Sequence, residues 1–189
     1  MLNQASTHMN RSYANDYKEI PAALAHNDPL RRRTVALVES DPILGKAFQG
    51  PGRTEAFRDI LRELALGRLI EGQAIRRTNR ELPRHQSPHA ASNRVFPSSW
   101  EERLIRMQFS RFYNQAVLEE LIERGEEHCF VEHSSAEDSD TPCSTVLAGR
   151  THRVEHLHRL LVEAYAQEQY SREPRIPNHP HCTHVVRPL

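Results

Sequence analysis

Two segments near the C-terminus carry cysteine and histidine side chains that could bind a metal ion. The first runs from Asp140 to Gly149 and contains Cys143, and the second runs from Pro177 to His184. One predicted helix separates them, so the loops at its two ends could meet in space. Zinc favours four tetrahedral ligands of thiolate and imidazole, and a structural site takes all four from the protein. The pattern therefore predicts a structural zinc with four ligands: Cys143, His179, Cys182 and His184.

Two other interpretations of these residues stay open, because the sequence lacks a paired Cys-x-x-Cys. The cysteines could be small buried hydrophobic residues, with histidines that are hydrogen-bonded or solvated. Alternatively, the second segment holds a catalytic divalent metal with an open coordination position, as in a small hydrolase or nuclease. The ligands of that alternative are His179, His181 and His184 with Asp138 or Asp140. The sequence contains no phosphate-binding glycine loop, His-Glu-x-x-His or Gly-x-Ser-x-Gly, so we predict that the protein is not an enzyme.

Other polar residues near the two segments are not among the four predicted zinc ligands. Three further side chains are reserve metal ligands: His128, Cys129 and His133. Four acidic residues of the same region cluster near histidines and could hold a divalent metal for hydrolysis, but we interpret them more simply as turn residues that cap helices and face water. They are Glu132, Glu137, Asp138 and Asp140.

The composition excludes several classes of protein. Lys and Arg number 25 and so do Asp and Glu, so the net charge does not favour nucleic acid as the main partner, and contact with DNA has no support. Three cysteines cannot form a closed disulfide framework, and we expect a reducing compartment. Residues 1–10 lack the pattern of a secretory signal, and no apolar run approaches the length of a membrane span. We therefore expect a soluble protein without a membrane partner.

The periodicity of apolar residues predicts a mainly helical α+β fold. Residues 1–80 are expected to form a helical N-terminal region, and residues 81–97, which contain three prolines, a linker or long loop. Residues 98–189 are expected to form a small C-terminal domain. That domain would contain two amphipathic helices, short strands and the two Cys/His loops.

Local signals place the expected elements. Asp41-Pro42 is a helix-start signal, and one long helix is expected over Thr54–Arg80, with Gly67 and Gly72 inside it. In the C-terminal domain, Ser98 or Ser99 is expected to cap a helix in a capping box. This helix should end at Gly125, and three elements should follow: a strand at Cys129–Val131, a helix at His152–Gln167 and a strand at Thr183–Val186.

The order of motifs in the second half resembles one known family. A helix carries Ser110–Ala116, Thr141–Cys143 leads into Leu147–Arg150, and the chain closes on Pro177–His184. This order resembles the head-morphogenesis domain of phage minor head proteins related to protein F of bacteriophage Mu. The resemblance covers about residues 100–189. In that family a Cys-x-x-Cys loop and a closing His-Pro-x-Cys-Arg-Cys are typical, whereas here Asp140 takes the place of the first Cys and His184 that of the last.

The resemblance implies a structural virion protein. Such proteins associate with the phage portal and capsid proteins and act in head assembly or genome delivery. By this resemblance the chain would be found in the virion, and in the host cytoplasm during assembly. The replacement of a cysteine by His184 preserves the chemistry of zinc binding, whereas Asp140 removes one thiolate from the family's pattern.

Overall fold

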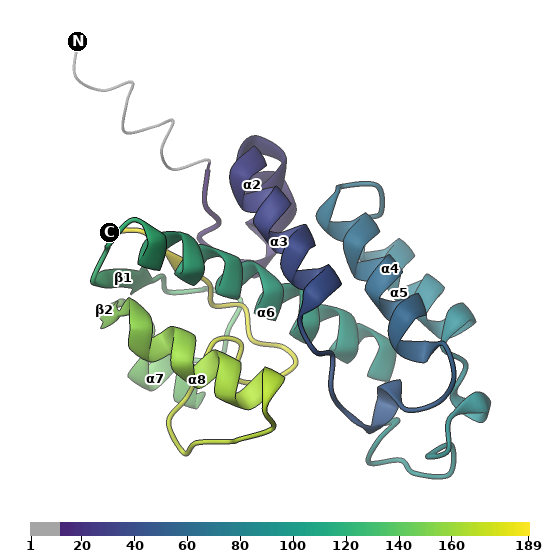
Figure 1. Cartoon of the computed structure of the whole chain (residues 1–189). Coiled ribbons are helices and arrows are strands. Elements are labelled where there is room, and N and C mark those ends of the chain that lie inside the picture. Colours follow the sequence, from purple (N-terminus) through teal and green to yellow (C-terminus); the bar gives the residue numbers. More distant parts are fainter. Residues whose placement is uncertain (1–11) are drawn as a thin grey trace.

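The fold is built around one long helix, α6 (Trp100–Glu123), which runs through the middle of the molecule (Figure 1). The computed structural model describes residues 12–189. Every residue of α6 from Gln108 to Leu118 is buried, because α3 and α5 pack on the helix from one side and α8 packs from another. A helix that is buried all round does not show a single apolar stripe. The buried polar residues in the middle of α6 are accommodated by hydrogen bonds, as for Asn114, which donates to the carbonyl of Ser110 and accepts from the N–H of Val186.

Between residues 12 and 99 the regular elements are all helical. The segments in order are η1 (Tyr17–Glu19), α2 (Ile20–His26), α3 (Asp28–Ser40), η2 (Lys46–Phe48), α4 (Arg53–Ala65), α5 (Glu71–Glu81) and η3 (Arg84–Gln86). The side chain of Asn27 caps α3 by accepting a hydrogen bond from the N–H of Leu30 at 3.1 Å, and Pro29 occupies the first turn. These two residues fix the start of α3.

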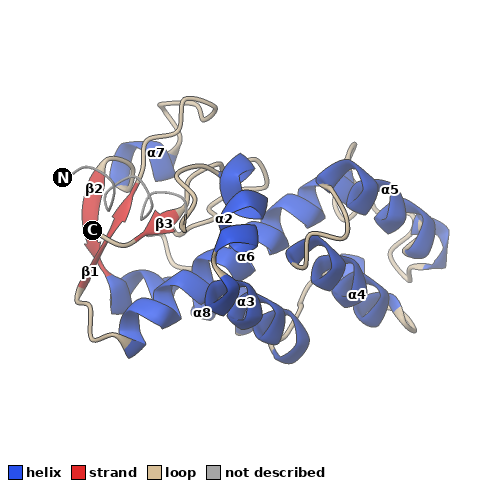
Figure 2. Cartoon of the chain, turned by 90° about the horizontal axis from the view of Figure 1, so that it is seen from above, coloured by secondary structure: helices blue, strands red, loops and turns tan. Residues whose placement is uncertain are grey.

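The C-terminal half adds a small antiparallel sheet to two further helices. Its elements are β1 (His128–Val131), α7 (Pro142–Val146), β2 (Arg150–Arg153), α8 (Val154–Ala166) and β3 (Val186–Arg187). The strand order is β2-β1-β3, with Cys129 opposite His152 and Val131 opposite Val186. Figure 2 shows the sheet and α7 at one end of the molecule and the pair α4 and α5 at the other. The predicted mainly helical α+β class is confirmed.

The strand predictions are confirmed at Cys129–Val131 and in part at the C-terminus. β3 contains only Val186 and Arg187, so the stretch from Thr183 to Val185 stays outside the sheet. β2 was not predicted, because its residues are polar and exposed or half-buried. Such a strand has no alternation of apolar and polar residues to reveal it.

The single helix predicted over Thr54–Arg80 is wrong. The structure contains two helices there, α4 and α5, which pack against each other. Gly67 adopts a left-handed backbone with φ of +71°, and Ile70 is extended. Glycine adopts the left-handed conformation without the steric cost that other residues pay, so Gly67 turns the chain where the apolar pattern suggested continuity.

Two predicted helix caps are also wrong. Ser99 has a left-handed backbone with φ of +56°, and its side chain caps nothing, because an N-cap needs an extended backbone to reach the N–H groups of the first turn. Asp41 follows the end of α3 instead of starting a helix. Its carboxylate accepts hydrogen bonds from Gln115 at 2.8 Å and from Arg111 at 3.3 Å, so it anchors the loop after α3 to α6.

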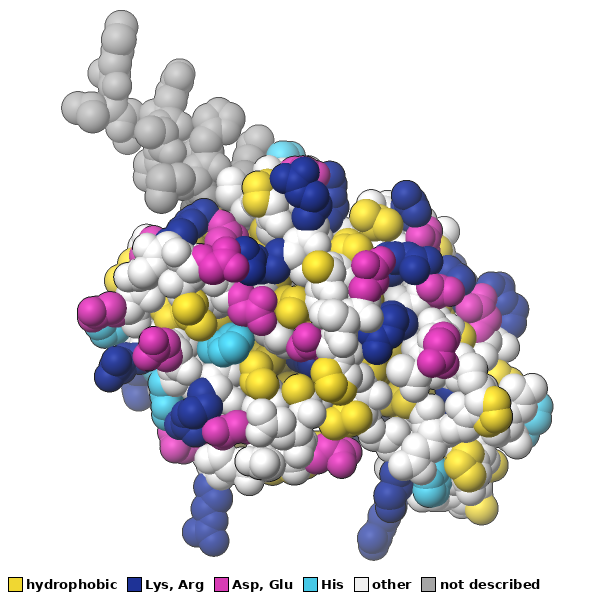
Figure 3. All heavy atoms as spheres, viewed as in Figure 1, with side chains coloured by type: hydrophobic (Ala, Val, Ile, Leu, Met, Phe, Trp, Pro, Cys, Tyr) yellow, Lys and Arg dark blue, Asp and Glu magenta, His cyan; other side chains and the backbone are white. Residues whose placement is uncertain are grey.

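One hydrophobic cluster contains residues of both halves, from Ala14 to Val186. The linker predicted at residues 81–97 contributes Leu82 and Phe96 to it, both of which are buried. The division into two domains stays a prediction. Acidic and basic side chains alternate over the face shown in Figure 3, in keeping with the balanced charge. No helix of the described residues is long and apolar enough to cross a membrane.

Candidate metal centre

Four donor side chains from three loops or turns converge beside the sheet. Glu137, Cys143, His179 and Cys182 each offer one atom, and these atoms all lie within 4.8 Å of one another. Within residues 12–189 this is the one group of three or more His, Cys, Asp or Glu side chains that could hold a metal ion. Three of its members are among the four predicted zinc ligands, whereas Glu137 was named only in the acidic group that was interpreted as facing water.

Short local structures place each donor. Glu137 lies in the turn that follows β1, and Cys143 lies in the first turn of α7, which the hydroxyl of Thr141 caps by accepting a hydrogen bond from the N–H of Ser144. His179 and Cys182 close a tight turn, in which the N–H of Cys182 donates to the carbonyl of His179 at 3.0 Å. The hydroxyl of Tyr165 on α8 donates to the carbonyl of Pro177 at 2.9 Å and anchors this loop.

The separations between the sulfur and nitrogen atoms fit a tetrahedral zinc. Ligand bonds of about 2.3 Å for sulfur and about 2.0 Å for nitrogen place two thiolates about 3.8 Å apart and a thiolate and an imidazole about 3.6 Å apart. The observed distances are 3.8 Å between the sulfurs of Cys143 and Cys182 and 3.5 Å between Cys143 Sγ and His179 Nε2. The two cysteines and His179 therefore fit the metal in donor type and spacing. Glu137 Oε1 lies 2.8 Å from His179 Nε2, closer than the separation of about 3.3 Å between two tetrahedral ligands at about 2.0 Å, so a bound zinc would move these two side chains apart.

The interpretation of Glu137 as a turn residue that faces water is wrong. Its side chain is only 3% exposed, so it does not face water, and Oε1 lies 2.8 Å from His179 Nε2. Its other oxygen, Oε2, accepts a hydrogen bond from the N–H of Thr183 at 2.7 Å. This contact fixes the carboxylate with Oε1 beside His179.

His184 lies next to the group but is not one of its four members. Its side chain is 1% exposed, and Nδ1 lies 3.8 Å from Cys182 Sγ and 3.8 Å from Glu137 Oε2. The structure thus places the fourth predicted ligand at the edge of the site, with Glu137 in the fourth position.

The two thiols share hydrogen bonds that shift their pKa values in opposite directions. The thiol of Cys182 donates to Cys143, which lowers the pKa of Cys143 well below its usual range, with further hydrogen bonds from His184 and Thr141. The same hydrogen bond and burial raise the pKa of Cys182. Cys143 is therefore the thiolate of the pair, the form that binds metal.

The reserve ligands lie outside the group. Cys129 is buried in β1, where its thiol donates to the carbonyl of His152 at 3.5 Å, and burial raises its pKa to about 12. His133 is exposed, and its ring covers Gly149 so closely that a Cβ on that glycine would meet the imidazole. These residues stabilise the sheet and its neighbouring turn.

The catalytic alternative is not assembled in the structure. His181, Asp138 and Asp140 are exposed and do not join the four donors. Ser144 lies 3.5 Å from His184 Nε2, but its hydroxyl donates to the carbonyl of Asp138 at 2.7 Å. That hydroxyl is therefore not poised as a nucleophile, which would need a closer general base.

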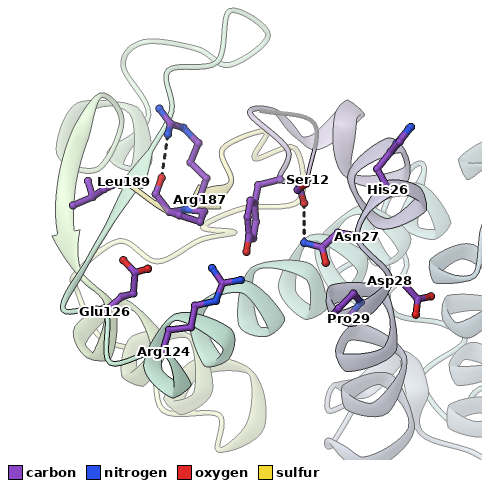
Figure 4. A pocket seen from close by; sticks show the side chains of 11 residues that line it. Ser12, His26, Asn27, Asp28, Pro29, Arg124, Glu126, Arg187 and Leu189 are labelled. Carbon is purple, nitrogen blue, oxygen red and sulfur yellow. Dashed lines mark hydrogen bonds between the residues drawn. The ribbon is translucent and has the colours of Figure 1, made fainter. Parts of the chain in front are cut away.

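A pocket of about 900 Å³ lies apart from the four donors (Figure 4). The junction of α2 and α3, the end of α6 and the C-terminus line it. Its two arginines are already paired with carboxylates, Arg124 with Glu120 and Arg187 with Glu132. None of the four metal donors lines this pocket.

Comparison with known proteins adds no relative. No family model matches the chain, and no curated protein and no solved structure matches it either.

Proposed function

We propose that this chain is a non-enzymatic structural protein of the phage minor-head type, and that a zinc ion closes its C-terminal half. The convergence of Glu137, Cys143, His179 and Cys182 at zinc-like spacing is the observation that carries the metal site. A bound zinc would supply a cross-link between the turn after β1, α7 and the closing loop. Binding energy at such a site becomes folding energy, which suits a loop-rich region with a sheet of three short strands.

The assembly role is supported by the order of elements. α6 carries the Ser110–Ala116 motif, α7 carries Cys143, α8 is the helical insert, and the loop with Cys182 follows. This is the order that the resemblance to the Mu protein F family predicts. In the proposed role, the N-terminal helices contact portal or capsid proteins, and the protein resides in the virion after assembly in the host cytoplasm.

The burial of the site favours a structural metal over a catalytic one. Both cysteines are almost fully buried and the Glu137 side chain is 3% exposed, which leaves His179, at 29%, as the one donor that reaches the surface. A hydrolytic metal keeps a coordination position open to water and substrate. Four protein donors around one point leave no such position in a tetrahedral site.

The metal site is tested by native mass spectrometry of the full chain purified without chelator. We expect one zinc per chain, and loss of that zinc in Cys143→Ser and in Cys182→Ser, each with a lower melting temperature. Cys129→Ser is the matched control, because this buried thiol lies outside the group and should leave the zinc content unchanged. A wild-type chain without metal, or unchanged zinc in both variants, contradicts the site.

The assembly role is tested by proteomic analysis of purified virions from the genome that encodes the chain. Its presence in few copies supports the proposal, and its absence from particles contradicts it. A divalent-metal nuclease assay tests the rival activity: cleavage that disappears in His179→Ala would replace the structural role with a catalytic one.

A further inference from the structure

The segment that precedes α2 docks against the metal loop. The main-chain N–H of Tyr17 donates to the carbonyl of Thr183 at 2.9 Å, and the N–H of Ala14 donates to the hydroxyl of Tyr113 on α6 at 2.7 Å. Thr183 directly follows Cys182 in the chain. Residues at the two ends of the described chain therefore meet one peptide away from a metal donor.

Thr183 is held from three directions. Its carbonyl accepts from Tyr17, its N–H donates to Glu137 Oε2 at 2.7 Å, and its hydroxyl donates to Ser134 Oγ at 2.7 Å. The residue is 3% exposed, so these bonds are shielded from water. Buried hydrogen bonds to a carboxylate fix its orientation strongly. Thr183 consequently fixes the orientation of the Glu137 carboxylate, with Oε1 beside His179.

Ser134 extends this contact to Asp16. The hydroxyl of Ser134 donates to the carboxylate of Asp16, and its oxygen accepts from Thr183 and from the N–H of Ala136. The other carboxylate oxygen of Asp16 accepts from the N–H of Lys18 at 3.0 Å and caps η1. Because the Ser134 hydroxyl donates its hydrogen bond to Asp16, the lone pairs of Ser134 Oγ are free to accept from Thr183. The Asp16 carboxylate thus links the N-terminal segment to the hydrogen bonds that hold Glu137.

We infer that Asp16 is a positioning residue of the metal site, acting through Ser134 and Thr183, and that metal binding and docking of the N-terminal segment strengthen each other. This inference rests on the metal site proposed above. Partners outside the first ligand shell orient ligands, and their loss typically weakens metal affinity by about 10- to 100-fold. Linkage between binding equilibria is reciprocal. A metal that stabilises Glu137 and the hydrogen bonds that hold it therefore also stabilises the docked N-terminal segment.

The test measures the zinc dissociation constant of the full chain by competition with a chromogenic chelator. We expect Asp16→Ala to raise that constant about tenfold, at the lower end of the range for outer-shell residues. Asp16→Asn keeps one acceptor oxygen where Asp16 uses two, one for Ser134 and one for the N–H of Lys18, so it should raise the constant less than Asp16→Ala does. Asp28→Ala is the matched control, because Asp28 pairs with Arg31 and Arg32 of its own helix.

A second measurement follows hydrogen exchange of the Tyr17 amide. Zinc should slow this exchange in the wild-type chain, and Asp16→Ala should remove most of that protection. A wild-type chain that binds no zinc contradicts the metal site itself. Zinc bound equally tightly by wild type and Asp16→Ala overturns only the role of Asp16.

One further variant keeps the inference open to refutation. If Asp16→Ala does not fold, Ser134→Ala removes the same link from the other side. An unchanged dissociation constant in Ser134→Ala then overturns the inference.

Discussion

Two residues, Glu137 and His184, are the candidates for the fourth position at the metal site, and the geometry separates them. Glu137 Oε1 lies 2.8 Å from His179 Nε2, and Glu137 Oε2 is held by Thr183. His184 Nδ1 lies 3.8 Å from Cys182 Sγ and from Glu137 Oε2 alike, and His184 is not one of the four converging donors. At the scale of single residues, Glu137 is a ligand candidate and His184 supports it.

This ranking predicts that substitutions of Glu137 and His184 weaken zinc binding by different factors. Glu137→Gln removes the carboxylate and should weaken zinc binding by more than about a hundredfold, beyond the range for outer-shell residues. His184→Gln should weaken it by about tenfold, as expected for a support. Competition with a chelator measures both constants. The reverse order of the two variants would assign the fourth position to His184.

Three of the four converging donors were predictable from residue type and order, and the fourth was not. Cysteine and histidine are rare enough in this chain that Cys143, His179 and Cys182 stood out. Four acidic residues share the turn region after β1, and nothing in their spacing distinguishes Glu137. Its burial depends on Thr183, which lies 46 positions later in the chain, so only the folded structure could reveal it.

At the scale of elements, apolar periodicity predicted helices well and their ends poorly. The positions of α6 and α8 agree with the predictions to within a few residues, although only α8 carries a single apolar stripe. The break between α4 and α5 was missed because the apolar residues continue through it, while the turn depends on the backbone of Gly67. The Asp41 cap was wrong because a distant helix uses the same carboxylate. Tertiary contacts decided both cases.

The two glycines of the missed break give a matched prediction. Gly67 has φ of +71°, and a methyl group on its Cα would meet open space, so Gly67→Ala should destabilise the protein by about 1–2 kcal/mol through backbone strain alone. Gly72 lies within α5, so Gly72→Ala should stabilise it by about 0.5 kcal/mol. Denaturant titration measures both free energies of unfolding. Stabilisation by both substitutions would instead support one continuous helix.

At the scale of the whole molecule, buried polar residues of α6 join the two halves. Arg111 donates to the carbonyl of Pro42 at 2.7 Å and pairs with Asp41, both in the N-terminal half. Asn114 Oδ1 accepts from the N–H of Val186 in β3 at 2.7 Å. Burial lowers the pKa of Arg111 to about 10, an effect that Asp41 opposes. One turn of α6 therefore bonds to segments more than 140 residues apart, Asp41 and Val186.

This shared helix predicts that the chain unfolds as one unit, despite the loop at residues 81–97. Differential scanning calorimetry of the zinc-loaded protein should give a single transition with equal calorimetric and van't Hoff enthalpies. Loss of a zinc present at 1,000 times its dissociation constant removes about 4 kcal/mol, so chelation should lower the melting temperature by about 10 °C. The transition should stay single, because the cluster that spans Ala14 to Val186 couples the C-terminal loops to the N-terminal helices. Two transitions, of which only one shifts with chelator, would instead place a domain boundary in residues 81–97 and confine the effect of the metal to residues 98–189.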